Sequence, residues 1–454
     1  MVRPSAARVL LFSLLPLAAL GGCDKSKPAA DAPTASASAP IAAAPSASAT
    51  GAAAPFAPAA RAATSPAMDL PTAEKNKLLA NGSNAFAFGL WSRVAKKSKG
   101  NFAMSPASMS IALAMTYGGA RGETAAQMKT ALHFGEEPEA LMTSWGSLSR
   151  TLADPARPIK LRIANRLFGE KTYAFGQPYL ERTRAAFGAP LEPVDFKSAP
   201  DPSRLHINGW VEEQTEKRIK DLLPAGSIKP LTRLVLVNAI YFLGDWLQQF
   251  DAAKTRSEPF SITATAKKQV PMMQQVDQFG FAQTGGVKVL ELPYKGNTAS
   301  LFVVLPDQVD GLAALEASLS TATFDAWRGA VSGQTVAVYL PRFEVNPAAG
   351  IQLSTELGAM GMPIAFDRGK ADFRAIGNPA DPNEHLSIDE VFHKAFVKVD
   401  EKGTEAASAT AVVMMGRGGP PPKPVELRAD HPFLFFIVDK DSGLILFIGR
   451  VTEP

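Results

Sequence analysis

Cysteine is almost absent from this chain of 454 residues, which contains only Cys23. A chain with one cysteine cannot form an internal disulfide. Charge is nearly balanced: the net charge is +4 and no RNA or DNA motif accompanies it, so we expect no nucleic-acid partner. Four of the five histidines are scattered without metal-ligand spacing, namely His133, His206, His385 and His431. No nucleotide loop or cofactor motif is present, so we expect neither a metal nor a cofactor.

The N-terminus has the layout of a targeting signal. The apolar stretch Val9–Leu20, preceded by Arg3 and Arg8, is too short to span a bilayer as a mature helix. It ends in LGGC, which resembles a bacterial lipobox, whose cysteine is lipidated and becomes the new N-terminus. The resemblance implies that residues 1–23 are a lipoprotein signal peptide and that Cys23 carries the lipid. The protein would then be secreted across the inner membrane and be lipid-anchored to the cell envelope or extracellular.

Two alternatives exist for this segment. One is a plain secretory signal that is cleaved elsewhere. The other is a catalytic role for the free thiol of Cys23, which no surrounding domain supports.

Residues 24–68 consist mostly of alanine, proline and serine. Almost nothing in this segment could pack into a core, which predicts a disordered tether. About 45 flexible residues would span roughly 35–40 Å, enough to hold a folded domain away from a membrane surface. The composition changes near Asp69, and we expect the folded domain over residues 69–454.

The folded part combines helical and strand patterns. The chain as a whole is 46% apolar and 20% charged, which is normal for a globular protein. Helical patterns dominate early and strand patterns late, without regular alternation, which indicates an α+β fold with large antiparallel or mixed sheets. Helical spacing covers 75–99, a segment after the N-cap Ser105, 139–152, 177–187 and 203 to about 223. Strand patterns cover 159–168, 233–242, 287–294, 299–306, 335–345 and a hairpin of 433–438 with 444–451.

One stretch near the C-terminus is unlike an ordinary loop or a core strand. Residues 401–419 read EKGTEAASATAVVMMGRGG. The first half has almost no bulky side chains, and the second half ends in a single cation, Arg417, flanked by glycines.

Six segments, in order, resemble landmarks of the serpin family over about 385 residues, from about Asp69 to Pro454. They are NFAMSPASMSIALAM (101–115), LVLVNAIYFLGDW (234–246), LELPYKG with SLFVVLP (290–306), YLPRFEV (339–345), KAFVKVDEKGTEAASAT (394–410) and DHPFLFFIVDKDSGLILFIGRV (430–451). The resemblance implies three β-sheets, eight or nine helices and an exposed reactive loop, here at about 401–424. In inhibitory serpins this loop is bait for a protease, and its first half inserts after cleavage as a new strand in the main sheet.

The residues of this loop meet the physical requirement for insertion, which is small or β-branched side chains on the inward face. One face presents small or β-branched, uncharged residues: Thr404, Ala406, Ser408, Thr410 and Val412. The other face presents Glu405, Ala407, Ala409, Ala411 and Val413, with its one charge near the start. Gly403 supplies a permissive backbone hinge.

The family's spacing also indicates the bond that a protease would cut. The residue before that bond lies sixteen positions after the first glutamate of the hinge, which is Glu401 here, and this count gives Arg417–Gly418. An arginine suits a trypsin-like protease, whose specificity pocket holds a carboxylate. Because loop lengths vary by a residue or so, Met414 or Met415 could instead precede the bond, which would favour chymotrypsin- or elastase-like targets.

Three further residues match serpin positions under the main sheet, where strands part to admit the loop: Ser105, Asn238 and His393. A serine and a histidine would also suit a hydrolase. However, no GxSxG elbow is present and no acidic partner can be placed, so we expect a structural hydrogen-bond network.

The sequence therefore predicts a monomeric, membrane-tethered serpin that traps a trypsin-like serine protease in a covalent complex and has no catalytic turnover of its own. Two alternatives remain open. One is a non-inhibitory serpin that acts as a binding or chaperone-like surface protein. The other is a cross-class inhibitor of papain-like cysteine proteases.

Overall fold

The structure is a computed structural model, and it describes residues 73–404 and 423–454. Nine α-helices lie within these ranges: α1 (Ala73–Val94), α2 (Pro106–Tyr117), α3 (Gly122–Ala131), α4 (Pro138–Leu152), α5 (Gln177–Phe187), α6 (Pro200–Gln214), α7 (Leu312–Ala317), α8 (Thr321–Ala330) and α9 (Ser354–Ala359). Three short 3-10 helices add η1 (Ala252–Lys254), η2 (Pro363–Phe366) and η3 (Pro382–Glu384).

The strands of the described residues form three sheets. The nine-stranded sheet runs in the order β1 (Phe102–Met104), β17 (Ile445–Val451), β16 (Phe433–Asp439), β8 (Ala299–Pro306), β7 (Val287–Pro293), β6 (Lys267–Thr284), β9 (Ser332–Pro341) and β15 (Val425–Arg428), with β5 (Arg256–Ser261) paired to β6. The six-stranded sheet runs β10 (Phe343–Val345), β13 (Val397–Val399), β14 (Gly403–Thr404), β4 (Leu234–Asp245), β2 (Lys160–Glu170) and β3 (Leu191–Val194). The third sheet pairs β11 (Ile351–Gln352) with β12 (Phe392–His393). This α+β arrangement of three sheets and nine helices confirms the expected fold class.

The ends of two helices follow directly from the sequence. Ser105 caps α2, because its side chain accepts a hydrogen bond from the backbone N–H of Ser108 at 3.2 Å and Pro106 occupies the first helical position. Helix α5 ends at Phe187 and is followed by Gly188, whose φ of 61° is a left-handed conformation that favours glycine.

The helix expected from residue 203 to about 223 is shorter than the apolar spacing indicated. Helix α6 ends at Gln214, and the backbone then takes positive φ angles at Glu216, Lys217 and Asp221. These left-handed residues break the helix, while Ile219 is still buried in the same apolar cluster as Val211. The apolar positions beyond Gln214 therefore belong to an irregular segment that follows the helix.

The apolar run 335–345 also differs from the single strand that its pattern suggested. Its first part is β9 of the nine-stranded sheet, and its last three residues are β10 of the six-stranded sheet. Arg342 separates the two strands. One sequence segment therefore links the two large sheets.

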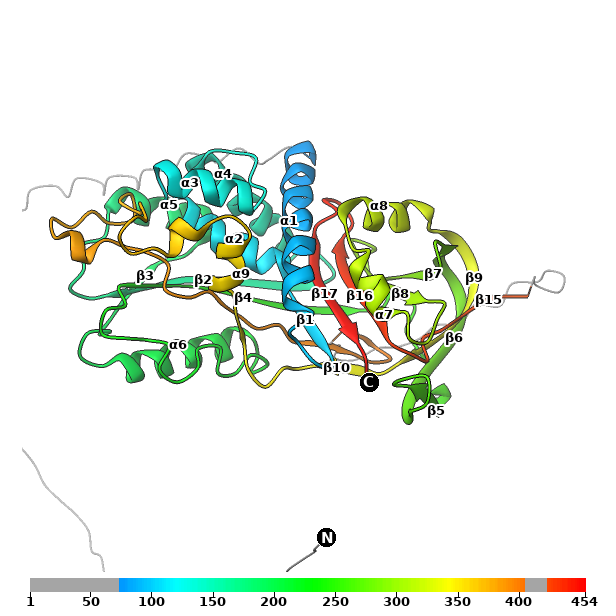
Figure 1. Cartoon of the computed structure of the whole chain (residues 1–454). Helices are drawn as coiled ribbons and strands as arrows, with labels where there is room; N and C mark the ends of the chain where they lie inside the picture. The colour runs from blue at the N-terminus through cyan, green and yellow to red at the C-terminus, as the bar shows by residue number, and fades with distance from the viewer. Residues whose placement is uncertain (1–72, 405–422) are drawn as a thin grey trace, which may run out of the picture. The chain divides into compact units, whose positions relative to one another are not determined.

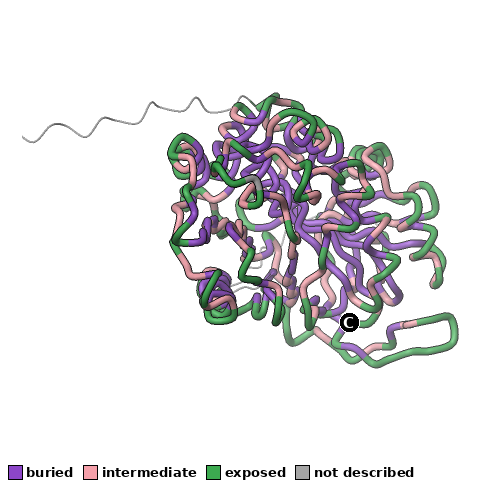
Figure 2. Tube along the Cα trace, turned by 60° about the vertical axis from the view of Figure 1, so that its left-hand side comes forward, coloured by how far each residue is buried: buried purple, intermediate pink, exposed green. Residues whose placement is uncertain are grey.

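Helices cover the six-stranded sheet on both faces. Figure 1 shows α6 on one side of β2, β3 and β4, and α2 with its neighbouring helices on the other. A small apolar cluster lies between α6 and the sheet and includes Trp210, Val211, Val237 and Ala239. The larger core joins α1, α2 and the nine-stranded sheet, and Figure 2 shows this buried chain in the interior with exposed residues outside it.

Candidate functional site

The start of the predicted loop already lies inside the six-stranded sheet. Gly403 pairs with Asp245 of β4, and Thr404 pairs with Gly244 of β4 on one side and Val399 of β13 on the other. Both pairings are antiparallel. These two hinge residues therefore form β14, a strand of two residues between β4 and β13.

Close backbone contact explains the glycine at this point. A Cβ atom on Gly403 would lie 2.0 Å from the backbone oxygen of Gly244 and 2.8 Å from the Cα of Asp245. No side chain fits in that space without moving the backbone, because real Cβ contacts are not that short. Gly403 is therefore required for β14 to sit against β4.

An aromatic cluster holds Thr404. The Thr404 side chain is buried, and its hydroxyl lies 2.7 Å from the hydroxyl of Tyr294. The Tyr294 ring stacks on Trp246, with centroids 4.7 Å apart and an interplanar angle of 13°. The indole Nε1 of Trp246 donates a hydrogen bond to the backbone oxygen of Asp400 at 2.9 Å. The chain entering β14 is thereby fixed to the end of β4.

Glu401 is anchored by charge. Its side chain is 8% exposed, and it accepts hydrogen bonds from Arg342 Nε at 2.7 and 2.9 Å and from the hydroxyl of Thr255 at 2.5 Å. Burial alone would raise the pKa of Glu401, but the hydrogen bonds from Arg342 and Thr255 outweigh it and hold the pKa below its usual range. Glu401 therefore stays ionised, and it ties the hinge to the residue that separates β9 from β10.

Below β14, the described residues leave one edge of β4 unpaired. Among the described residues, Leu234–Leu243 of β4 pair with β2 on one edge only, while β14 reaches no further than Gly244 on the other edge. Leu234, Val235 and Leu236 are only partly buried, in contrast to the wholly buried β16. An edge of unpaired N–H and C=O groups is a template for another strand.

A cavity of about 280 Å³ lies in the part of this opening farthest from β14, beside residues 234–238 of β4. One wall is the first half of β4, the opposite wall is the chain from Asn383 to His393, and residues of α2 such as Met109 and Leu113 line its base. We call this opening the groove. Its unpaired strand edge offers backbone N–H and C=O groups to an extended peptide segment.

The three residues predicted to lie under the sheet fall into two connected sets. The backbone N–H of Ser105 donates to Nε2 of His393 at 2.9 Å, and the Ser105 hydroxyl donates to the backbone oxygen of Leu446 at 2.7 Å. Burial lowers the pKa of His393 to about 4, so the ring is neutral near pH 7 and accepts this hydrogen bond. The Ser105 hydroxyl does not face the imidazole, so the pair is not arranged as nucleophile and base.

Asn238 is hydrogen-bonded to neither Ser105 nor His393. It accepts a hydrogen bond from the Ser108 hydroxyl, and its amide donates to Asn165 Oδ1 at 2.7 Å. Ser108 and Asn165 are members of the network that the sequence reasoning missed. For Asn165 the signal lies in the strand pairing, because Asn165 is directly opposite Asn238 in the register of β2 and β4.

Other predicted residues lie outside the described residues: Cys23, Glu405, Ala406, Ala407, Ser408, Ala409, Thr410, Arg417 and Gly418. Over residues 73–404 and 423–454, no three His, Cys, Asp or Glu side chains gather in a way that could hold a metal ion. In those same ranges, no helix combines the length and apolar character needed to cross a bilayer.

Comparison with known proteins defines the class. The family model described as serpin (serine protease inhibitor) matches residues 81–454. The leukocyte elastase inhibitor of Equus caballus is 40% identical over 363 residues, covering 78% of this chain and 93% of the relative. The chain therefore belongs to the serpin family.

Solved structures agree with this assignment. Cleaved Serpin 42Da has a TM-score of 0.74 at 30% identity, covering 84% of this chain and 99% of that one. The loop-inserted structure of a cleaved ovalbumin mutant has a TM-score of 0.74 at 29% identity, covering 83% of this chain and 100% of that one.

Proposed function

We propose that this serpin inhibits a trypsin-like serine protease as a suicide substrate, with Arg417–Gly418 as the bond that is attacked. The observation that carries the proposal is the placement of Gly403 and Thr404 between β4 and β13, at the head of an open groove. The protease would form an acyl-enzyme at the Arg417 carbonyl, and strand entry into the groove would then outrun deacylation.

The sidedness of the sheet supports this. Thr404 and Gly244 are paired, and Phe242 on the same face packs against Tyr294. Asn238, also on that face, bonds Ser108 of α2, so this face of β4 looks towards α2. An entering strand that continues the register would put its even-numbered residues there: Ala406, Ser408, Thr410 and Val412.

These side chains suit the face they would meet. They are small or β-branched and uncharged, so entry needs neither overpacking nor a buried charge. The odd-numbered residues would face the α6 side, where Val235, Val237 and Ala239 already pack. The segment from Thr404 to Arg417 would extend about 45 Å. This is comparable to the length of β4 together with the residues that lead into it.

A second target class is favoured by one observation. The relative from Equus caballus is named as an elastase inhibitor. If the bond follows Met415 or Met414 in this chain, a chymotrypsin- or elastase-like protease becomes the target. The non-inhibitory alternative and the papain-like alternative predict different outcomes in the same experiment.

The test is a panel of purified trypsin-, chymotrypsin-, elastase- and papain-like proteases, each mixed with the full chain near equimolar ratio. We expect trypsin activity to be lost and a C-terminal peptide beginning at Gly418 to be released. The Arg417→Ala variant should no longer inhibit trypsin, whereas the Met415→Ala variant should still inhibit it. Cleavage with no loss of any protease activity would favour the non-inhibitory alternative, and a peptide beginning at Gly416 would move the bond to Met415.

The location of the protein is a separate part of the proposal. We expect Cys23 to carry a lipid that anchors a monomeric, secreted domain to the cell envelope. In a bacterial expression host, the wild-type chain should partition into the detergent phase and Cys23→Ala should not. Wild-type protein in the aqueous phase with a processed N-terminus elsewhere would favour a plain secretory signal.

A further inference from the structure

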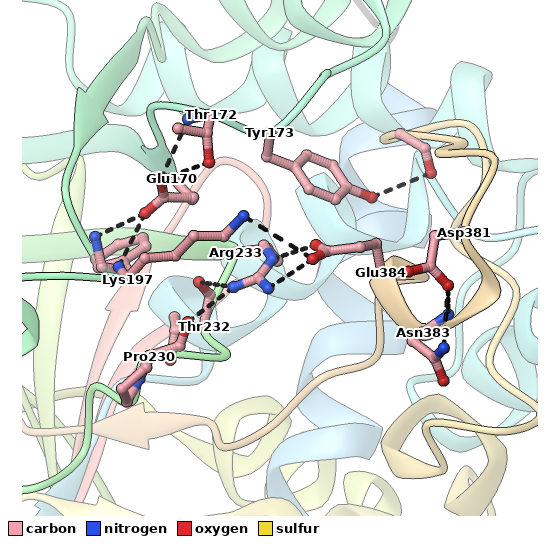
Figure 3. A network of polar contacts seen from close by, with 12 residues as sticks. Glu170, Thr172, Tyr173, Lys197, Pro230, Thr232, Arg233, Asp381, Asn383 and Glu384 are labelled. Carbon is pink, nitrogen blue, oxygen red and sulfur yellow. Dashed lines mark hydrogen bonds and ion pairs between the residues drawn. The ribbon is translucent and has the colours of Figure 1, made fainter.

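The far end of the groove, opposite β14, is closed by an ion pair between Arg233 and Glu384, which Figure 3 shows from close by. Arg233 directly precedes β4, and Glu384 is the last residue of η3 and lies at the start of the other wall of the groove. Two hydrogen bonds join them: Arg233 Nε donates to Glu384 Oε2, and Nη2 donates to Oε1 at 2.9 Å. The contact is therefore bidentate, the strong geometry for this pair of groups.

Both partners are held in place by their own surroundings. The Arg233 side chain is 9% exposed, and its Nη1 also donates to the backbone oxygens of Pro230 and Thr232. Glu384 is 29% exposed, and the Lys197 ammonium lies 3.9 Å from it. The hydrogen bond from Arg233 holds the pKa of Glu384 below its usual range, so the carboxylate is ionised near pH 7.

Strand entry and this contact are incompatible. At present the two side chains touch across the groove. If the register of β14 continued, a strand reaching Arg233 would place the two walls two strand spacings apart, roughly 9–10 Å. Ile388 rather than Glu384 would then lie level with Arg233, so the pair would also be offset by the four residues that separate Glu384 from Ile388. A direct hydrogen bond cannot span that separation.

We infer that the Arg233–Glu384 ion pair is a latch that keeps the far end of the groove closed and must break before an entering strand completes the sheet. The inference rests on the proposed function. It adds that the last step, completion of the sheet by the entering strand, depends on opening of the ion pair. The first residues of a strand, down to the level of Val237, would enter without touching the latch. The remaining residues would enter only after the ion pair opens.

The latch can be tested without a protease by following the uptake of labelled peptides by the full chain on native gels. A long peptide of residues 405–417 would extend past Arg233 in the continued register. A short peptide of residues 405–411 would end opposite Val237. We expect Glu384→Gln to take up the long peptide about ten-fold faster than the wild type, and the short peptide at an unchanged rate.

A matched variant separates the latch from general destabilisation. Arg450 and Glu316 form a comparably buried pair, in which Nη1 donates to both carboxylate oxygens at 3.0 and 3.2 Å and the Arg side chain is also 9% exposed, but they join β17 to α7. Glu316→Gln should leave both uptake rates as in the wild type. The double variant Arg233→Glu with Glu384→Arg should return the long peptide to its slow uptake.

The inference is overturned if Glu384→Gln and the wild type take up the long peptide at equal rates, or if Glu316→Gln accelerates uptake to the same extent. A protease arm keeps this failure distinct from failure of the proposed function. Trapping of trypsin with equal uptake rates would remove the latch alone. Faster uptake by Glu384→Gln without any trapping would leave the latch and remove the inhibitory function. No uptake of either peptide by any variant would contradict the latch, and the protease arm alone would then decide the inhibitory function.

Discussion

The hydroxyl of Tyr294 lies 2.7 Å from the hydroxyl of Thr404, and both side chains are buried. Tyr294 belongs to the buried core, whereas Thr404 begins the segment that we propose enters the groove. This contact therefore holds the hinge at the entrance of the groove. Tyr294→Phe leaves the buried Thr404 hydroxyl without this partner and should lower stability by about 1–2 kcal/mol. Denaturant unfolding of the two proteins measures the change, and equal midpoints would contradict the assigned contact.

Gly403→Ala should expel β14 from the sheet. The added Cβ would lie 2.0 Å from the Gly244 oxygen, and only a backbone shift can relieve that contact. We expect faster hydrogen exchange at the Thr404 amide and easier proteolysis after Lys402. Gly329→Ala is a suitable control, because no atom lies within 4 Å of the corresponding Cβ position. Unchanged exchange at Thr404 would mean that the hinge is not held in this way.

Arg342→Ala should destabilise the protein more than an ordinary surface change. It leaves the carboxylate of Glu401 buried with only Thr255 as a side-chain partner, and we expect a loss of about 1–3 kcal/mol, reduced by the partial exposure of Arg342. Lys268→Ala removes an exposed ion pair with Glu453 and should cost about 0–1 kcal/mol. Thermal unfolding of both variants compares the two losses, and equal losses would contradict the anchoring role of Glu401.

His393 should make stability depend on pH in a defined window. Burial lowers its pKa from 6.5 to about 4 in the folded protein, so between these values the unfolded chain binds a proton that the folded chain does not. Stability from this group is complete above pH 6.5 and is lost as the pH falls towards 4, on the order of 2 kcal/mol between pH 7 and 5. His393→Gln can still accept the Ser105 hydrogen bond and should lose less stability over that interval. Identical pH profiles would contradict the assignment.

Much of the fold could be predicted from local signals, but the site depended on distant contacts. The capped start of α2 and the hairpin of β16 and β17 carried clear patterns, and the small residues after Gly403 indicated an insertable strand. The pairing of Gly403 with Asp245 joins segments far apart in the chain, and no local pattern encodes it. The same holds for the latch, since Glu384 lies in a segment without strand or helix periodicity. Arg342 looked like part of one strand because its change of sheet is set by tertiary packing.

The most direct test of the account is a denaturing gel of the full chain mixed with trypsin near equimolar ratio, beside the variant Thr410→Arg. The variant keeps Arg417 but would bring a charge to the face of the sheet that looks towards α2. The account predicts a band at the summed mass for the wild type, and cleavage without that band for the variant. A summed-mass band from both proteins, or from neither, would contradict strand entry into the groove as the step that traps the protease.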